Sequence, residues 1–404
     1  MLGQELSLKG RKVGIIGFNA RPIASSIKAL GGTTYVSDYW GDSDLAACSD
    51  EWIAVLSPLP GSRQRGSLEN PVHVSLSQNF LAAFSEIDLD HILIGSGFDD
   101  HSESLLDIQK QFGLTGNSVI QMSNARQKDR IKQILEETKL DIRMPLSRYC
   151  SSFDQVMTET AKIGFPCVVR PYTSGGGSGI RIFADSGKLE EYLSKREKFE
   201  LIVQEYIGGR DISASVLATA DQAKVLSIQG QLVGIPSAGR NCDFVYCGNY
   251  IPIALEASIL TSITECSEIL VNELGLVGSN GLDFVLSNES EIVLLEVNPR
   301  IQGTLEMLER AGNTSVTRMH LDAVEGTFTD TIPSWQPTVK MILYARKDGV
   351  VPDLARYPST VDRSPKGVVV NRGDPVCTII ATADSVRAGY SSACRTAMKI
   401  HRNL

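Results

Sequence analysis

Two apolar segments in the middle of the chain, 281–286 and 291–298, constrain its fold most strongly. Each is rich in aliphatic residues over the length of a typical strand, and the polar tetrapeptide 287–290 separates them. Apolar runs of this length on either side of a short polar turn predict a β-hairpin. The chain is therefore expected to contain an antiparallel strand pair whose residues can be assigned to faces.

Three oxygen-bearing side chains, those of Asp283, Glu296 and Asn298, lie in these two segments. With a four-residue loop between the strands, Asp283 faces Leu294 and lies diagonally beside Glu296. Asn298 then shares the face of Glu296, because side chains alternate along a strand. A loop of three or five residues would break this parity. The four-residue loop predicts that three oxygen ligands converge on one face.

The acidic end of the second segment predicts a cation site. Two carboxylates beside an apolar strand are costly to bury unless a positive charge neutralises them. Mg²⁺ shared with phosphate fits, because this ion takes one or two carboxylates and binds substrate oxygens as well. Arg300 follows the strand and could stabilise the charge that develops during a transfer reaction. The alternative is a structural ion pair between Glu296 and Arg300.

A glycine-rich segment between two short predicted strands, 167–170 and 181–183, indicates a loop that can approach phosphate closely. Glycines let backbone N–H groups come near an anion, and Arg170 stands at the start of the segment. No Gly-Lys-Ser/Thr leads into a helix, so this is not a Walker loop. The alternative to a phosphate lid is a flexible hairpin connection. The lid would consist of Ser174, Gly175, Gly176, Gly177, Ser178 and Gly179.

The end of a strand predicted at 201–206 has residues that suit a nucleoside. An adenine needs backbone donors and acceptors at its edge with apolar faces above and below, and a ribose needs a carboxylate. Glu205, Tyr206 and Ile207 could supply the first set, and Asp211 could supply the second. An ordinary strand end fits these residues equally well.

The segment 12–116 alternates short apolar runs with stretches of helical period, which predicts βαβ units and a parallel sheet in an α/β domain. Its first strand ends in a turn with Asn19 and Arg21, and a glycine turn at Ser96 would lie at the same carboxyl edge, where ligands favour binding. The first turn lacks the spacing of a dinucleotide fold. These three residues, together with Arg300, are candidates for holding an acceptor substrate. A plain turn with Asn19 as a helix cap is the alternative for the first turn.

The composition narrows the class of protein. Lys+Arg 39 against Asp+Glu 47 gives a formal net charge of -8, which argues against sequence-independent binding to nucleic acid or to an anionic membrane. No apolar run approaches the roughly 20 residues of a membrane-spanning helix. The eight cysteines show no C-x-x-C pair and no zinc-finger spacing. We expect a cytoplasmic protein that acts on small molecules.

In order and spacing, the motifs resemble those of the ATP-grasp superfamily over roughly residues 12–330. The turn at 17–22 and the segment 302–306 look most like a group of predicted ATP-dependent carboligases distantly related to biotin carboxylase. The motifs that carry the resemblance are Lys128, Arg170-Pro171, the glycine-rich loop, Glu205-Tyr206-Ile207 with Asp211, Asp283, and Glu296-Val297-Asn298-Pro299-Arg300.

The resemblance implies an ATP-grasp fold of the α/β class with ATP and Mg²⁺ or Mn²⁺ as cofactors. It implies a Rossmann-like pre-ATP-grasp domain at 1–122 and a small lobe with the glycine-rich lid at 123–208. A large lobe with the metal site would follow at 209–328, and a β-rich accessory unit at 329–404. Because many relatives are dimers, a homodimer is compatible with the resemblance.

The resemblance also implies a role for each motif residue. Lys128 and Arg170 would hold the α- and β-phosphates, with Arg126 and Arg130 as rivals for the place of Lys128. Arg170 departs from the usual Lys, and a guanidinium binds phosphate as a fork rather than as a point charge. Gly175 to Gly179 would close over the phosphates. Glu205, Tyr206 and Ile207 would contact the adenine and Asp211 the ribose. Asp283, Glu296 and Asn298 would bind the metal, and Arg170 and Arg300 would act in the transfer step.

The activity that the resemblance implies is that of a carboxylate-amine ligase. A substrate carboxylate would attack the γ-phosphate of ATP, and an amine would then displace phosphate to form an amide. The substrate would be an amino acid or a coenzyme precursor. Carboxylation through activated bicarbonate is one alternative, because the segment after 330 loosely resembles the tail of biotin carboxylases. A nucleotide-binding regulator without turnover is another.

Overall fold

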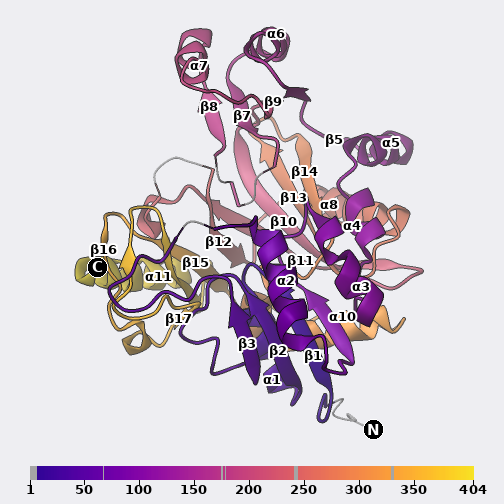
Figure 1. Cartoon of the computed structure of the whole chain (residues 1–404). Coiled ribbons are helices and arrows are strands. Elements are labelled where there is room, and N and C mark those ends of the chain that lie inside the picture. The colour runs from indigo at the N-terminus through magenta and orange to yellow at the C-terminus, as the bar shows by residue number, and fades with distance from the viewer. Residues whose placement is uncertain (1–6, 67, 174–175, 178, 241–243, 329–331) are drawn as a thin grey trace.

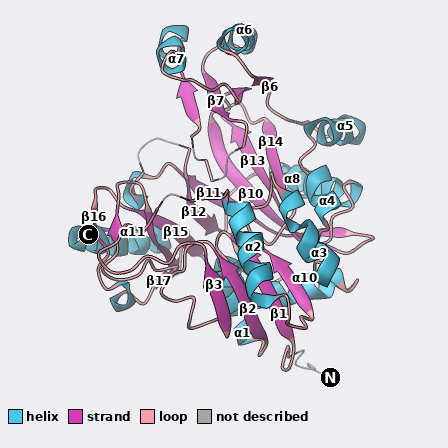
Figure 2. Cartoon of the chain, in the orientation of Figure 1, coloured by secondary structure: helices cyan, strands magenta, loops and turns pink. Residues whose placement is uncertain are grey.

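The computed structural model describes residues 7–66, 68–173, 176–177, 179–240, 244–328 and 332–404. They form four sheets with helices packed against them (Figure 1 and Figure 2). Parallel and antiparallel sheets with covering helices confirm the predicted α/β class. In this part of the chain, no helix combines the length and the apolar character needed to cross a membrane.

The N-terminal sheet is parallel, with the strand order β3-β2-β1-β4. This arrangement confirms the predicted βαβ alternation. The end of β1 lies directly against the turn after β4. A Cβ atom added to Gly17 would be only 3.2 Å from the Cα of Gly95. The elements are β1 (Lys12–Gly17), α1 (Arg21–Ala29), β2 (Thr33–Asp38), β3 (Glu51–Ala54), α2 (Val72–Phe84) and β4 (His91–Ile94).

Four short helices lead from this sheet to the rest of the chain. Ser118 starts one of them with a capping box, in which its side chain and that of Gln121 each accept a backbone N–H of the other residue. The helices are η1 (Ser102–Leu105), α3 (Leu106–Phe112), α4 (Val119–Asn124) and α5 (Lys128–Thr138).

A four-stranded antiparallel sheet follows, in the order β6-β9-β7-β8. Two helices pack on one of its faces through a small apolar cluster, at the top of Figure 1. The glycine-rich segment joins β7 to β8, as predicted. The elements are β6 (Ser147–Cys150), α6 (Phe153–Ile163), β7 (Cys167–Pro171), β8 (Arg181–Phe183), α7 (Ser186–Leu193) and β9 (Leu201–Glu205).

The largest sheet has nine strands in the order β17-β19-β15-β12-β11-β10-β13-β14-β5. Its strands and its covering helix α8 are β5 (Ile142–Arg143), β10 (Gly209–Ala218), β11 (Ala223–Val233), β12 (Tyr246–Ile251), α8 (Ala257–Glu273), β13 (Gly278–Ser287), β14 (Ile292–Asn298), β15 (Thr338–Tyr344), β17 (Thr360–Val361) and β19 (Pro375–Thr382). The C-terminal strands β15, β17 and β19 thus extend the sheet that contains the predicted hairpin.

The remaining elements lie beside this sheet. Helix α11 packs on β15 and β19 through Ala393, Ala397 and Ile400. The elements are η2 (Pro236–Ala238), α9 (Leu305–Gly312), α10 (Val316–Val324), β16 (Gly349–Val350), η3 (Leu354–Arg356), β18 (Val369–Val370) and α11 (Val386–Asn403).

The two faces of the nine-stranded sheet differ in polarity. On one face, Ile212 of β10 and Phe284 of β13 are fully buried in an apolar cluster with α8. On the other face, Ser213 is paired with Asp283 of β13 on one side and with Gln229 of β11 on the other. Side chains alternate between the two faces along each strand. The apolar face therefore packs against helix α8, and the polar face can bind ligands.

Candidate active site

The hairpin of β13 and β14 has a different register from the predicted one. Leu286 is paired with Ile292, so the loop has five residues. Its first residue, Ser287, accepts hydrogen bonds from the backbone N–H groups of Glu289 and Glu291 at 3.2 and 3.0 Å, which stabilises the longer loop.

A β-bulge then restores the parity that a five-residue loop alone would have lost. The register shifts between Asp283 and Phe284, so Asp283 lies opposite Glu296 and not opposite Leu294. The predicted pairing was therefore wrong, but the two deviations cancel. Asn298 Nδ2 donates to Asp283 Oδ2 at 3.0 Å and to Glu296 Oε1 at 3.4 Å. The three predicted metal residues therefore lie together.

The charges around these residues suit a bound cation. Burial, and then the nearby Glu296, raise the pKa of Asp283 to about 7. Burial also acts to raise the pKa of Glu296, but the guanidiniums of Arg126 and Arg300 hold it below its usual value. The Glu296 side chain is 44% exposed, so a ligand can reach it.

The donor set also fits the chemistry of Mg²⁺. It comprises two carboxylates and one amide, and Mg²⁺ takes one or two carboxylates plus phosphate and water oxygens. Among the described residues, no three His, Cys, Asp or Glu side chains come together as a metal site. An ion here would therefore depend on Asn298 and on phosphate or water oxygens. Asp283 also accepts a hydrogen bond from Gln231 Nε2 of β11 at 2.6 Å, a contact that the sequence did not predict.

Two basic side chains, Lys128 at the start of α5 and Arg170 in the small sheet, lie close enough to Glu296 for its charge to raise the pKa of each. Lys128 begins α5 and donates from Nζ to Ser147 Oγ at 3.4 Å. Burial lowers the pKa of Arg170 at the end of β7, and Glu296 is the nearby charge that most opposes this shift. The charges of the predicted residues Lys128 and Arg170 thus both interact with that of Glu296 in the folded protein.

Of the rivals for the place of Lys128, Arg126 is bound to acidic side chains. Its guanidinium lies 2.6 Å from Asp100 and 3.3 Å from Glu296. It therefore links the end of β14 to the loop after β4. The role of Lys128 as a phosphate ligand stays a prediction, with Arg130, which is exposed on α5, as the remaining rival.

Two aspartates in the loop after β4 complete the site, and the sequence reasoning missed both. Arg300 Nε donates to Asp99 Oδ1 and Oδ2 at 2.9 and 3.1 Å, and Asp100 binds Arg126. The available signal was an acidic pair just after a glycine turn at the carboxyl edge of the sheet. Through these pairs the N-terminal sheet positions both arginines beside Glu296.

The predicted nucleoside residues do not all have free side chains. Arg143 Nη1 and Nη2 donate to the two carboxylate oxygens of Glu205 at 2.8 and 2.9 Å. Tyr206 packs edge-on against Phe244 with ring centroids 6.2 Å apart. Burial raises the pKa of Asp211 on β10 to about 6. An adenine contact at Glu205 would therefore use its backbone.

The glycine-rich segment is described at Gly176, Gly177 and Gly179, all with positive φ. Tyr246 N donates to Gly176 O at 3.1 Å. A Cβ on Gly177 would overlap the carbonyl oxygen of Phe244, so only glycine fits there. The segment therefore rests on the start of β12. The other predicted lid residues, Ser174, Gly175 and Ser178, lie outside the described residues.

The three residues of the N-terminal sheet that were predicted to hold the acceptor substrate lie in three different environments. Ser96 O accepts from Phe18 N at 2.7 Å, and Ser96 is partly exposed. Asn19 does not cap α1, whose N-cap is Ala20 with no side-chain hydrogen bond. Arg21 is 3% exposed and pairs with three carboxylates, an arrangement that does not favour its predicted role as a substrate ligand.

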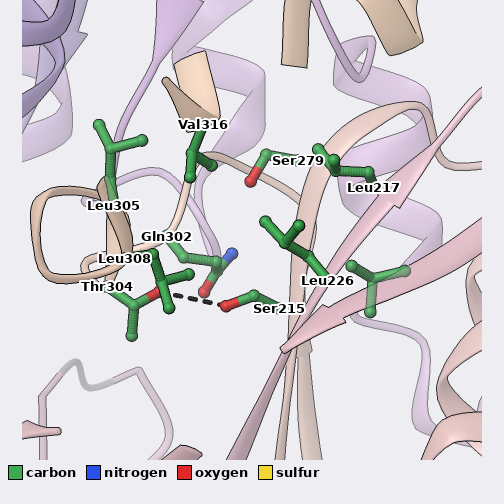
Figure 3. Close-up of a pocket in the computed structure, with 10 residues that line it drawn as sticks. Ser215, Leu217, Leu226, Ser279, Gln302, Thr304, Leu305, Leu308 and Val316 are labelled. Carbon is green, nitrogen blue, oxygen red and sulfur yellow. Dashed lines mark hydrogen bonds between the residues drawn. The ribbon is translucent and has the colours of Figure 1, made fainter. Parts of the chain in front are cut away.

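A small cavity lies on the same side of β10 as the polar face, beside α9 and α10 (Figure 3). Ser215 Oγ and Thr304 Oγ1 are 3.2 Å apart within it, and Leu305 and Val316 contribute apolar walls. Its lining among the described residues includes none of the predicted nucleotide or metal residues. We therefore assign it to packing between α9, α10 and the sheet.

Comparison with known proteins gives matches over most of the chain. The family described as ATP-grasp domain matches residues 125–304. An uncharacterized protein of Methanocaldococcus jannaschii is 23% identical over 373 residues, which cover 91% of this chain and 87% of that protein. The carbamoyl phosphate synthase large chain of a Nostoc species is 25% identical over 280 residues, which cover 67% of this chain but only 24% of the relative.

Solved structures are similar over nearly the whole chain. N5-carboxyaminoimidazole synthase from Aspergillus clavatus, in complex with ADP and an aminoimidazole ribonucleotide, has a TM-score of 0.71 at 16% identity and covers 98% of this chain and 100% of its own. The biotin carboxylase domain dimer of Hydrogenobacter thermophilus 2-oxoglutarate carboxylase, with MgADP and bicarbonate, has a TM-score of 0.72 at 14% identity, covering 96% and 89%. These similarities confirm the ATP-grasp fold.

Proposed function

Because residues 125–304 form an ATP-grasp domain, we propose that the chain is an ATP- and magnesium-dependent ligase that joins a carboxylate to an amine. The observation that carries the proposal is the convergence of Asp283, Glu296 and Asn298, with Lys128 and Arg170 close enough to Glu296 for their charges to interact with it. An oxygen donor set with two cationic side chains near it suits a nucleotide polyphosphate with its metal. The substrate would be an amino acid or a coenzyme precursor.

In the first proposed step, an oxygen of the substrate carboxylate attacks the γ-phosphorus of ATP. The bond from that phosphorus to the β,γ-bridging oxygen breaks, and ADP leaves with the bonding electrons. Lys128 and Arg170 hold phosphate oxygens, and Arg300, oriented by Asp99, stabilises the charge on the transferred group. When bound at Asp283, Glu296 and Asn298, Mg²⁺ supplies charge neutralisation and orients those oxygens.

In the second proposed step, the amine nitrogen attacks the acyl carbon of the acyl phosphate. The carbon–oxygen bond to the phosphate breaks, phosphate leaves with the electron pair, and the amine loses a proton to phosphate or solvent. The glycine-rich segment would cover the phosphates and keep water from the activated acyl group.

The nucleotide products test this proposal. Incubation with ATP, magnesium and a panel of carboxylates and amines should yield ADP and phosphate, in amounts that require one carboxylate and one amine together. AMP with pyrophosphate would contradict the proposed chemistry. Nucleotide binding without turnover across the panel would support a regulator.

A second candidate function is carboxylation through activated bicarbonate. The similar biotin carboxylase domain structure contains MgADP and bicarbonate, which supports it. Incorporation of labelled bicarbonate into an amine-containing product would favour this alternative. Formation of ADP that requires another carboxylate, without incorporation of label, would favour the amide ligase.

Lys128 gives the nucleotide site an expected pH dependence. Burial first, and then the neighbouring Arg170 and Arg126, lower the pKa of Lys128 to about 8. The ammonium form attracts phosphate and the neutral amine does not, so the affinity for ATP should fall as the pH rises through about 8. Lys128→Arg keeps the charge at these pH values and should remove this fall. Titrations of Mg·ATP binding that show the same pH profile for both proteins would contradict the assignment.

A further inference from the structure

An unsatisfied amide lies on the polar face of the nine-stranded sheet. Asn249 of β12 is 1% exposed. Its Oδ1 accepts a hydrogen bond from the hydroxyl of Tyr246, and its Nδ2 has no partner among the described residues. A buried donor without an acceptor is unfavourable, and native proteins leave few of them. The Nδ2 group therefore calls for an acceptor from a bound molecule.

The neighbours of Asn249 determine what kind of acceptor fits. Across the sheet it is paired with Gln231 of β11 and with Lys340 of β15, so the three side chains share one face. The amide of Gln231 donates to Asp283 Oδ1, and the ammonium of Lys340 donates to the carbonyl oxygen of Gly303. With the Lys340 ammonium on one side and the unpartnered Nδ2 group of Asn249 at the centre, this place favours a negatively charged oxygen.

Tyr246 connects this place to the candidate active site. Its hydroxyl orients the Asn249 amide, and its backbone N–H binds Gly176 of the glycine-rich segment. Asp283 and Arg300 are both close enough to Tyr246 to affect the pKa of its phenol, which burial raises. A ligand on Asn249 would therefore lie between the metal residues and the glycine-rich segment.

We propose that Asn249, oriented by Tyr246, binds an oxygen of the substrate carboxylate. This inference rests on the proposed function and deepens it, because it names the side chain that holds the group to be phosphorylated. The class of ligand is a small carboxylate, and bicarbonate has the same oxygen chemistry. Tyr246 is a positioning residue, and Asn249 makes the contact.

Binding of ¹³C-labelled acetate and bicarbonate to the full chain tests the proposal, with the protein saturated by magnesium and a non-hydrolysable ATP analogue. Asn249→Asp keeps the acceptor for Tyr246 and replaces the donor by a repelling oxygen. The affinity for the bound probe should fall at least about tenfold. Asn249→Leu, which adds no charge, should also lower the affinity for the probe. Tyr246→Phe should lower it by a smaller factor. The affinity for the nucleotide analogue should remain unchanged in each variant.

Asn272→Asp serves as the matched control, because Asn272 is exposed near the end of α8. It should leave both affinities unchanged. Equal carboxylate binding by the wild type and both Asn249 variants, or no binding of either probe to the wild type, would overturn the proposal. If the wild type nevertheless forms ADP in the presence of a carboxylate and an amine, the subsite proposal would fail but the proposed function would stand. A tenfold loss of carboxylate affinity in the Asn249 variants, together with no turnover by the wild type, would support the carboxylate subsite and count against the proposed ligase activity.

Discussion

Replacement of Glu296 by glutamine is expected to lower turnover by at least about a hundredfold while the fold stays intact. The amide keeps the size of the side chain but removes the charge that, with Asp283, suits Mg²⁺. The cost to the fold should be small, because the side chain is 44% exposed and Arg126 keeps its contact with Asp100 at 2.6 Å. Rates of ADP formation over a magnesium titration, with unfolding curves for both proteins, measure the two effects.

Glu291→Gln provides the matched control for this variant. Glu291 immediately precedes the same strand, is 51% exposed and lies 3.1 Å from Arg143. Loss of an exposed ion pair costs little, so turnover and stability should remain close to those of the wild type. If Glu296→Gln retains more than about a tenth of the wild-type rate at saturating magnesium, Glu296 is not a required metal ligand.

The largest effect on stability is expected from replacement of Arg21 by methionine, which should cost about 3–5 kcal/mol of unfolding free energy. Arg21 Nε lies 2.6 Å from Asp362 Oδ1 and 3.7 Å from Asp44 Oδ2, and Nη2 binds Glu306. Burial would lower the pKa of Arg21, but the three carboxylates raise it. Without the guanidinium, these buried charges lose their main partner. Equilibrium unfolding in urea measures the loss.

The same variant should recover stability as the pH falls. Burial acts to raise the pKa of Asp362, and in the wild type Arg21 is the largest influence holding it below its usual value. Once Arg21 is removed, the folded-state pKa should exceed the unfolded value. The folded protein then binds the proton more tightly than the unfolded chain, so part of the lost stability should return as the pH falls toward the ordinary pKa of a carboxyl group.

Arg310→Met is the control for the Arg21 variant. Arg310 contacts the same Glu306 at 2.6 Å, but its side chain is 38% exposed. Its loss should cost less than about 1 kcal/mol and show little recovery at lower pH. A cost below about 1 kcal/mol for Arg21→Met as well would show that the buried cluster does not depend on this guanidinium.

Sequence patterns predicted the strands of the site because those strands are short apolar runs bounded by polar or glycine-rich turns. Residues 167–170 and 181–183 were predicted as strands, and β7 and β8 lie at Cys167–Pro171 and Arg181–Phe183. The register of the hairpin could not be predicted in this way. It depends on the hydrogen bonds of the Ser287 hydroxyl in the loop and on the bulge, neither of which changes the apolar pattern.

Contacts between distant segments could not be predicted either. Arg21 was a candidate substrate ligand, but its partners Asp362 and Glu306 are 341 and 285 positions away in the sequence. The partnership of Asp99 with Arg300 spans 201 positions. Such pairs arise only when the sheets pack together, so local spacing contains no signal for them.

The position of bound metal relative to Asp283 and Glu296 decides whether the hairpin of β13 and β14 is the metal site. A crystal structure with a non-hydrolysable ATP analogue and Mn²⁺ would locate the ion by its anomalous scattering. We expect an ion within roughly 2.0–2.2 Å of oxygens from both carboxylates and from the nucleotide phosphates, with Lys128 and Arg170 on those phosphates. A metal–nucleotide complex bound away from the end of β14 would show that Asp283 and Glu296 are not the metal ligands.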